Sequence, residues 1–538
     1  MNRLSKETPP GWTDSVPQME AESTLSRLQL MVLIGVYFLV VAVGIAHHEM
    51  WGDELQAWML ARDSGSVPEL LHNMRHEGHP AAWHLLLFVI SRFTRDPVAM
   101  QLLHLALATA TVFVLVRWAP FSALQKILLA FGYFFIYEYA VISRGYVLGA
   151  LALFVICAAF PSRKRSYLPL AFPLVLLANT SAYGFLIAFA LGAMLLAEWG
   201  TGRHLRAEFA GARWDPWLAL VLAVVGGIAA MVQLLPPSDS HFFAPAVAAR
   251  AGWSRWRVAD SLSAVWSGYV PIPLLWTPHR WDTNLLADGG FWPLFAAVRL
   301  SFALLLAAVL LLVRTPYALL FFLLGSGGVV AFTYLVWGGN TRHYGHLFLV
   351  LLASLWIARI SPPSERLFPP FRGFRAYALR WGNPWLTLIL VVQVIAGAIL
   401  YLEDLRKPFS SAQRTADFIQ RSGLGALPIA GSPSLPASAL AGHLDREIFN
   451  LDNGRFSTFV AWGIKGGKMP PGGVVDRARP LLTSTTPMLV LALGDSLAQG
   501  ARGPGVRLVA YFAPGILPGE RYYLYLMRRD LDPHATEY

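Results

Sequence analysis

The sequence predicts a polytopic α-helical membrane protein with about eleven transmembrane helices and a C-terminal soluble α/β domain. Of its 538 residues, 55% are hydrophobic and 14% are charged, whereas a soluble globular chain carries about 25% charged residues. Aromatic residues reach 13% and include 19 tryptophans, which are typical of segments that anchor at membrane–water interfaces. This composition excludes a disordered chain and argues against a wholly soluble enzyme.

Apolar runs of about 20 residues, the length that a membrane-spanning helix needs, recur along the first three quarters of the chain. The run at 80–91 is shorter, opens with Pro80 and contains His84, so we expect a helix that lies at the membrane surface without crossing. Together these features predict one transmembrane module over 28–402. The predicted spans are 28–46, 98–117, 121–137, 145–160, 167–180, 183–199, 216–235, 292–313, 315–337, 346–360 and 385–402.

The distribution of basic residues predicts the orientation, because cytoplasmic loops are enriched in Lys and Arg. With the N-terminal tail 1–27 in the cytoplasm, the short inward segments carry 17 basic residues and the outward loops carry ten. The net charge of +11 therefore follows from membrane topology, and it gives no reason to expect nucleic-acid binding. The segments expected outside the cytoplasm are the loops 47–97, 138–144, 236–291 and 338–345 and the tail 403–538.

The tail is a different kind of polypeptide from the rest of the chain. It contains 15 basic and 12 acidic residues, and it is long enough to form its own hydrophobic core. Short β-type runs occur at 487–493, 506–512 and 522–527, and the pattern at 411–421 is helical. Strands that alternate with helices predict a small α/β domain over 403–538.

The first external loop is rich in groups that can take part in catalysis. Residues 47–80 contain six carboxylates and five of the 14 histidines. Asp53 and Glu54 follow the first span and fall in the first turn of a helix expected to run to about Arg62, where the helix dipole favours anions. A solvated acidic loop would show the same pattern, and this alternative stays open. Two adjacent carboxylates at the depth of lipid headgroups favour a functional site.

Two motifs in this loop resemble the GT-C superfamily of membrane glycosyltransferases, which includes the protein O-mannosyltransferases and the aminoarabinose transferases of lipid A. The first is WGDE-x-x-x-W at the end of the first span, and the second is E-x-HP, which opens the short apolar helix. The resemblance covers roughly 28–402. It implies that Asp53 and Glu54 are the catalytic residues, with Asp53 as the base and Glu54 beside it. It also implies that Glu77 and His79 lie at the substrate.

The segment YEYAVISRGYVL, between the third and fourth predicted spans, carries a second match to this superfamily. Many members have an acidic residue followed by Arg and Tyr in their second external loop, and the resemblance places Glu138, Arg144 and Tyr146 there as substrate-binding residues. An interfacial aromatic belt with a snorkelling arginine is the alternative. Glu138 favours a functional site, because a carboxylate at a membrane boundary is costly unless it is solvated or paired.

The segment WGGNTRHYGHLF, on the outward side before the tenth span, is a compact group of hydrogen-bond donors. A lipid-linked phosphate at this interface requires charge-assisted hydrogen bonds, and arginine supplies a bidentate fork. Arg299 lies inside the eighth predicted span, where an arginine normally faces a cavity or a partner such as an anionic headgroup. A simple loop is the alternative for this segment. Its candidate substrate-binding residues are Arg342, His343, Tyr344 and His346.

Together with these residues, the resemblance to the GT-C superfamily implies an inverting glycosyltransferase that takes a sugar from a polyprenyl-phosphate donor at the outer face of a bacterial-type inner membrane. Asp53 would deprotonate the acceptor hydroxyl, and one of the three arginines named above would stabilise the departing phosphate. Carboxylates suit Mg²⁺ or Mn²⁺, so Asp53, Glu77 and Glu138 are also candidate ligands of a divalent cation. The acceptor could be a glycan, a lipid or a protein, and membrane lipids are expected partners.

A second class of function stays open, a non-enzymatic lipid or glycolipid transporter or flippase. Many spans with ionisable residues fit it equally well, but no inverted repeat is evident and a large external domain is unusual for it. A third class, another polymerising or ligating transferase, would carry its key loop late in the chain. We expect the tail domain to lie as a lid over the first loop and to shape acceptor access without carrying the bond-making step.

Overall fold

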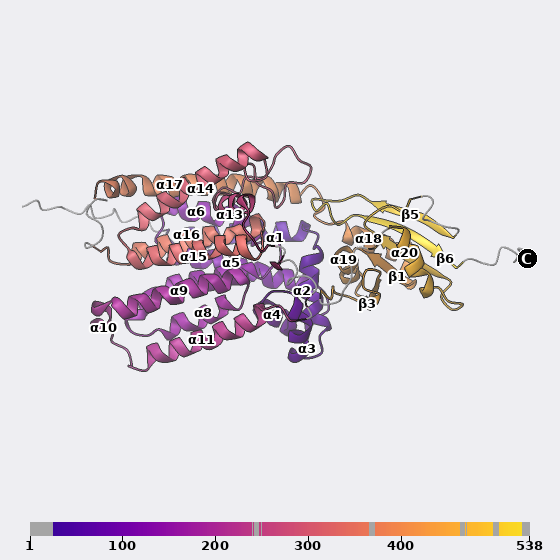
Figure 1. The fold of residues 1–538 in the computed structure, drawn as a ribbon, viewed down its shortest axis with the longest axis horizontal. Helices are drawn as coiled ribbons and strands as arrows, with labels where there is room; N and C mark the ends of the chain where they lie inside the picture. Colours follow the sequence, from indigo (N-terminus) through magenta and orange to yellow (C-terminus); the bar gives the residue numbers. More distant parts are fainter. Residues whose placement is uncertain are drawn as a thin grey trace, which may run out of the picture.

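The transmembrane module predicted by the sequence is a bundle of long helices. The computed structural model describes residues 25–238, 250–364, 372–462, 471–498 and 505–529, together with positions 240, 247, 248 and 469. Within these residues, nine helices are long and apolar enough to cross a membrane, and they lie side by side with the C-terminal domain at one end (Figure 1). They are α1 (Arg27–His47), α5 (Val98–Trp118), α7 with its 3₁₀ continuation η3 (Tyr146–Lys164), α9 (Ala182–Thr201), α11 (Asp215–Leu234), α14 (Phe291–Leu312), α15 (Pro316–Leu335), α16 (Thr341–Ile360) and α17 (Arg372–Asp404).

Two of the eleven predicted spans, 121–137 and 167–180, are shorter than expected. A helix of eleven residues is about 16 Å long, roughly half of the hydrocarbon core of a bilayer. Gly132 separates the first segment into two pieces, since glycine is a poor helix former, and Pro173 removes a backbone donor inside the second. The elements found there are α6 (Ala123–Ala130) with the π-helical turn η2 (Phe134–Glu138), and α8 (Leu168–Ala178).

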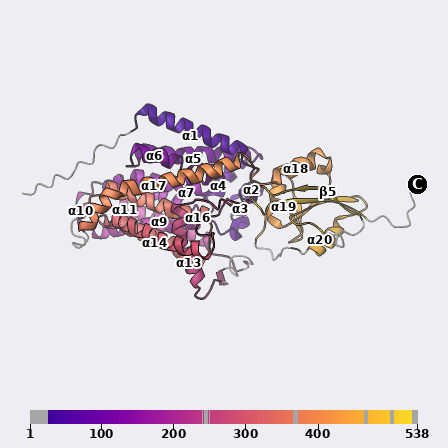
Figure 2. The ribbon, with the colours of Figure 1, turned by 90° about the horizontal axis from the view of Figure 1, so that it is seen from above.

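The first loop, residues 47–97, forms a layer of short helices at the end of the bundle that carries the C-terminal domain (Figure 1). The apolar run expected to lie at the surface is α4 (Ala82–Ser91), which is ten residues long and packs against α2 (Gly52–Asp63). α3 (Val67–Asn73) connects these two helices, and α13 (Arg255–Tyr269) precedes α14. Seen from above, α1 lies along the edge of the bundle, where it contacts α5 (Figure 2).

The C-terminal domain contains a six-stranded mixed sheet in the order β3-β2-β1-β4-β6-β5. β1 pairs in parallel with β2 and β4, whereas the other pairs are antiparallel. The three predicted strands and the predicted helix are present within one residue of their expected bounds. The missed strands have three or four residues, too few to show an alternating pattern. The elements are α18 (Ala412–Arg421), β1 (Ile429–Ser432), α19 (Ser434–Leu444), β2 (Ile448–Asn450), β3 (Arg455–Ser457), α20 (Pro471–Ala478), β4 (Met488–Leu493), β5 (Val506–Phe512) and β6 (Tyr522–Arg528).

The domain and the first loop share one hydrophobic core. Leu55, Trp58 and Met59 of α2 are fully buried, and they belong to the same apolar cluster as Ile429 of β1 and Leu440 of α19. We expected a lid that lies over the first loop. The domain instead packs against α2 through a shared core, so that α2 is enclosed between the bundle and the domain. Fully burying one such side chain contributes about 1.5–3 kcal/mol.

Candidate active site

Asp53 lies in the first turn of α2, directly after the first span. The helix begins at Gly52, and Trp51 before it has an extended conformation. Asp53 and Glu54 are the acidic residues of the first turn, where the dipole of the helix favours negative charge. The side chain of Asp53 is 25% exposed, so this carboxylate is partly accessible to solvent.

Two arginines from distant segments converge on Asp53. Arg144, between η2 and α7, donates through Nη1 to Oδ2 of Asp53, and Nη2 of Arg342, in the first turn of α16, lies 4.0 Å from the same oxygen. Burial alone would raise the pKa of Asp53, but the two guanidinium groups outweigh it and hold the pKa below its ordinary value. Asp53 is therefore an ionised carboxylate beside two cations.

Residues that the sequence did not single out hold Arg342 in place. Its Nη1 donates to Oδ2 of Asp282 at 2.6 Å, and its guanidinium group lies 5.0 Å from the ring centre of Trp281 and 5.6 Å from that of Trp51. Asp282 has a φ of 63°, in the left-handed region that aspartate tolerates better than most residues. No local signal marks Asp282, because its partner is 60 residues away in the sequence.

Glu54 points away from Asp53 although the two are adjacent. It is fully buried and accepts hydrogen bonds from Nε2 of His48 at 2.9 Å and from the backbone amide of Ser143 at 2.6 Å. Nδ1 of His48 also bonds Oδ2 of Asp404 at 2.7 Å. Burial would lower the pKa of His48, but Glu54 and Asp404 raise it to about 10. A charged imidazolium therefore ties the ends of α1, α2 and α17 together, and both carboxylate oxygens of Glu54 are engaged in hydrogen bonds.

Glu77 lies between α2 and the C-terminal domain. Its Oε1 accepts a hydrogen bond from Nε2 of Gln56 at 2.8 Å, and the side chain of Trp462 donates another. The Gln56 amide also bonds the backbone N–H and carbonyl of Val460, at 2.8 and 2.9 Å. Burial raises the pKa of Glu77 to about 7, so this carboxyl group changes its charge near neutral pH. The C-terminal domain thus contacts the predicted site residue Glu77 directly through the side chain of Trp462.

His79 and Tyr146 flank Arg144. Burial lowers the pKa of His79 to about 4, and the charge of Arg144 acts in the same direction, so the imidazole is neutral. The guanidinium group of Arg144 lies 5.6 Å from the ring centre of Tyr146. The rings of His343 and His346 pack against Tyr146 with centroids 5.9 and 5.4 Å away. The two buried histidines therefore form an aromatic wall behind the arginines.

Three other predicted residues make no direct contact with Asp53. Glu138 is 1% exposed and accepts hydrogen bonds from the hydroxyl of Tyr133 at 2.6 Å and from Nε1 of Trp281 at 3.0 Å, so it fixes the ring that packs on Arg342. Tyr344 donates its hydroxyl to a backbone carbonyl of the preceding loop. Arg299 is exposed on α14 and makes no hydrogen bond or ion pair with the residues that the structure describes.

The three carboxylates suggested as metal ligands do not form one group. Among the described residues, no three His, Cys, Asp or Glu side chains are placed to hold a metal ion. Glu138 is occupied by its two hydrogen-bond donors, and the guanidinium groups beside Asp53 would repel a divalent cation. This donor set fits an anionic group of a substrate better than Mg²⁺ or Mn²⁺.

The fold and this site define a class of protein, a multi-pass helical membrane protein with an α/β domain docked over its first loop. No protein-family model matches the chain, and no curated protein matches its sequence. The crystal structure of ArnT from Cupriavidus metallidurans bound to undecaprenyl phosphate matches with a TM-score of 0.50 and 12% identity, over 93% of this chain and 98% of that chain. This match confirms the predicted fold class.

A second solved structure is that of the arabinofuranosyltransferase AftD from Mycobacteria. It matches with a TM-score of 0.37 and 14% identity, over 95% of this chain and 42% of that chain. The chain thus spans less than half of that larger protein.

Proposed function

We propose that this protein is a membrane glycosyltransferase that transfers a sugar from a polyprenyl phosphate to an acceptor hydroxyl. The observation that supports it most is the pairing of Asp53 with Arg144 and Arg342, three residues from separate segments at one end of the bundle. Guanidinium groups form strong, directional hydrogen bonds to phosphate. A carboxylate within reach of them is placed to receive a proton from a nucleophile.

The proposed reaction is a direct displacement with inversion. The acceptor oxygen attacks the anomeric carbon, the bond from that carbon to the phosphate oxygen breaks, and the phosphate leaves with the electron pair. Asp53 takes the proton of the acceptor hydroxyl, while Arg144 and Arg342 neutralise the charge that develops on the phosphate. This sequence of events consumes no other reagent.

The arginines also explain how a carboxylate with a lowered pKa can act as a base. Before the donor binds, both guanidinium groups act on Asp53 and lower its pKa. A bound phosphate would share these cations, so their effect on Asp53 would weaken and its pKa would rise. Donor binding would therefore increase the basicity of Asp53 at the moment when a base is needed.

Binding of undecaprenyl phosphate to the purified protein in nanodiscs tests the phosphate clamp. We expect Arg342→Ala and Arg144→Ala to weaken binding about tenfold to a hundredfold, since a hydrogen bond between charged groups contributes about 1.5–3 kcal/mol. Arg117→Ala is a matched control, because Arg117 lies in the last turn of α5, beyond the site. Unchanged affinity in both site variants would contradict the proposal. Binding without release of sugar from any lipid-linked donor of the native membrane would favour a transporter.

Chelation with EDTA tests whether transfer requires the divalent cation that the sequence suggested. The proposed step uses two guanidinium groups in place of a metal, so we expect EDTA to change the transfer rate by less than about twofold. A rate that falls with EDTA and recovers with added Mg²⁺ or Mn²⁺ would contradict this mechanism. It would instead support a cation at Asp53 and Glu77.

We further propose that the site faces the outer side of a bacterial-type inner membrane, with the N-terminus in the cytoplasm. The support is the excess of basic residues, 17 against ten, on the segments that the sequence predicts to lie opposite the first loop. The first loop and the C-terminal domain share a core, so one orientation places both on the same side.

A further inference from the structure

A polar cavity of about 610 Å³ lies at the other end of α2, between the first loop and the C-terminal domain. Its volume falls within the range of about 300–1,000 Å³ that is usual for ligand pockets. The first loop contributes the C-terminal end of α2 with the following turn, and the loop after α4. The domain contributes the segments before β2 and around β3. The proposed reaction does not use this cavity.

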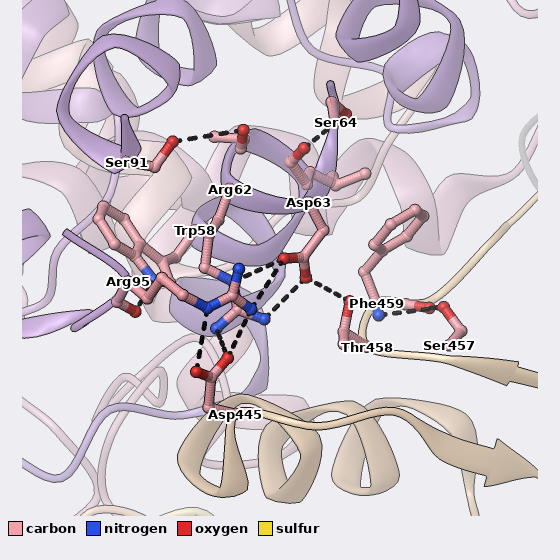
Figure 3. A network of polar contacts seen from close by, with 12 residues as sticks. Trp58, Arg62, Asp63, Ser64, Ser91, Arg95, Asp445, Ser457, Thr458 and Phe459 are labelled. Carbon is pink, nitrogen blue, oxygen red and sulfur yellow. Dashed lines mark hydrogen bonds and ion pairs between the residues drawn. The ribbon is translucent and has the colours of Figure 1, made fainter. Parts of the chain in front are cut away.

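The wall between the two parts is held rigidly by an ion network (Figure 3). The side chain of Arg62 is fully buried and pairs with Asp63 at 2.7 Å and with Asp445 of the domain at 2.8 Å. Arg95 bonds Asp445 at 2.7 Å, and Thr458 donates to Asp63 at 2.6 Å. Because every one of these groups has a partner, the wall is formed before any ligand binds.

The remaining lining offers donors and acceptors in balance. Glu69 and Glu447 carry carboxylates, Arg92 and Arg446 carry guanidinium groups, and Asn73 carries an amide. Phe456 of the edge strand β3 is 49% exposed beside these polar groups. Balanced charge selects against a strongly charged ligand, while an exposed ring next to acceptors and donors fits the apolar face and the hydroxyl groups of a sugar.

The position of the cavity relates it to the reaction. Asp53 and Asp63 occupy opposite ends of α2, and ten residues of helix span about 15 Å, the length of a short oligosaccharide. α2 is enclosed between the bundle and the domain, so the distance between the two sites is fixed. The distance from the cavity to the carboxylate thus matches the length of a short chain of sugars.

We propose that this cavity binds a neutral oligosaccharide, as the distal part of a glycan acceptor whose terminal hydroxyl reaches Asp53. This inference rests on the proposed function and names the class of its acceptor. A peptide acceptor is disfavoured because the lining consists of polar side chains with one exposed ring, and it lacks the row of apolar pockets that alternate side chains of a peptide would need.

A glycan array probed with the purified full chain in nanodiscs tests the inference. We expect the protein to retain neutral oligosaccharides, and we expect Phe456→Ala and Glu447→Gln each to weaken retention about tenfold. Tyr511→Ala is the matched control, since Tyr511 is a 48% exposed aromatic residue on β5, at the opposite edge of the same sheet. The control variant should bind like the wild type.

Undecaprenyl phosphate binding, measured on the same samples, separates the two proposals. It should be equal in all four proteins, because the cavity lies away from the arginines. Failure to retain any glycan, equal retention by the Phe456 and Tyr511 variants, or retention of peptides in place of glycans would overturn the inference while leaving the phosphate clamp intact. Loss of lipid-phosphate binding in the wild type would instead refute the proposed function.

Discussion

At the scale of single residues, Asp53 has to meet two opposing requirements. A base must be ionised, which the neighbouring guanidinium groups ensure by lowering its pKa, yet a carboxylate with a very low pKa is a weak base. Both requirements are met if the donor phosphate, once bound, shares the two guanidinium groups, because the pKa of Asp53 then rises. Asp282 holds Arg342 at 2.6 Å, so at least one arginine stays in place when its second partner changes.

The variant Asp53→Asn separates these two roles. We expect transfer to be abolished, because the amide keeps the shape of the side chain and removes its basicity. We also expect tighter binding of undecaprenyl phosphate, by about tenfold, since a negative charge beside the phosphate site has been removed. Transfer assays and lipid-phosphate binding in nanodiscs measure both. Near-normal transfer would eliminate Asp53 as the base, and weaker binding would contradict its position beside the clamp.

At the scale of elements, α2 is fixed at both ends by the C-terminal domain. At its start, Oε1 of Glu520 accepts a hydrogen bond from the backbone N–H of Gly52 at 2.8 Å. A Cβ atom at Gly52 would lie 2.8 Å from the same oxygen and 2.8 Å from Leu435, so only glycine permits this approach. At its end, Arg62 pairs with Asp445. The helix that carries the proposed base is thus positioned by a domain that follows it by more than 300 residues.

The pH dependence of stability tests the contact at Glu520. Burial raises the pKa of Glu520 to about 7, above its ordinary value. Its contribution to stability is therefore fully present below that ordinary value and is lost as the pH rises through about 7. Thermal unfolding of the full chain in nanodiscs should thus occur at lower temperature at pH 8 than at pH 6.

Glu520→Gln should reduce this slope, because its amide is neutral at every pH. Glu77, whose pKa is also raised to about 7, adds a dependence of the same sign, so part of the slope should persist. Glu447→Gln is the control, as Glu447 is exposed on the same domain. A slope that is the same in wild type and Glu520→Gln would show that this carboxyl group does not control docking.

At the scale of the whole molecule, the sequence predicted what depends on local patterns. Long apolar runs predicted eleven spans, of which nine are long helices among the described residues, and short β-type runs predicted β4, β5 and β6. Asp53 and Arg144 were found because each lies in a short motif. Pairings between distant segments left no such signal: Asp282 meets Arg342 and Glu520 meets Gly52 only in the folded chain. The short strands of the domain were missed for the same reason, since tertiary pairing defines them.

Cysteine labelling tests the orientation of the molecule. Ser66→Cys in the first loop and Ser484→Cys in the domain are exposed positions at one end, and Ala212→Cys is exposed between α10 (Arg203–Glu208) and α11 at the other. The native Cys157 is buried, so we expect the thiol reagent not to label it. In intact cells, an impermeant thiol reagent should label the first two variants and spare the third. The reverse pattern would place the site in the cytoplasm.

A protein truncated after Arg406 tests whether the C-terminal domain is only a lid or is needed to form the active site. A lid would leave hydrolysis of a lipid-linked donor intact and reduce only transfer to the acceptor. The packing predicts a different result, because truncation exposes the buried side chains of Leu55, Trp58 and Met59 and removes the bond from Glu520 to Gly52.

We therefore expect hydrolysis and transfer to fall together, while undecaprenyl phosphate still binds through Arg342, which Asp282 holds in place. The full-length variant Gly52→Ala provides a matched test without truncation, since its added Cβ atom would press on Glu520 and Leu435 and disturb the start of α2 alone. It should lower hydrolysis and keep lipid-phosphate binding. Hydrolysis at the wild-type rate by the truncated protein would mean that the bundle alone orients α2, and the role of the domain would then be confined to the acceptor.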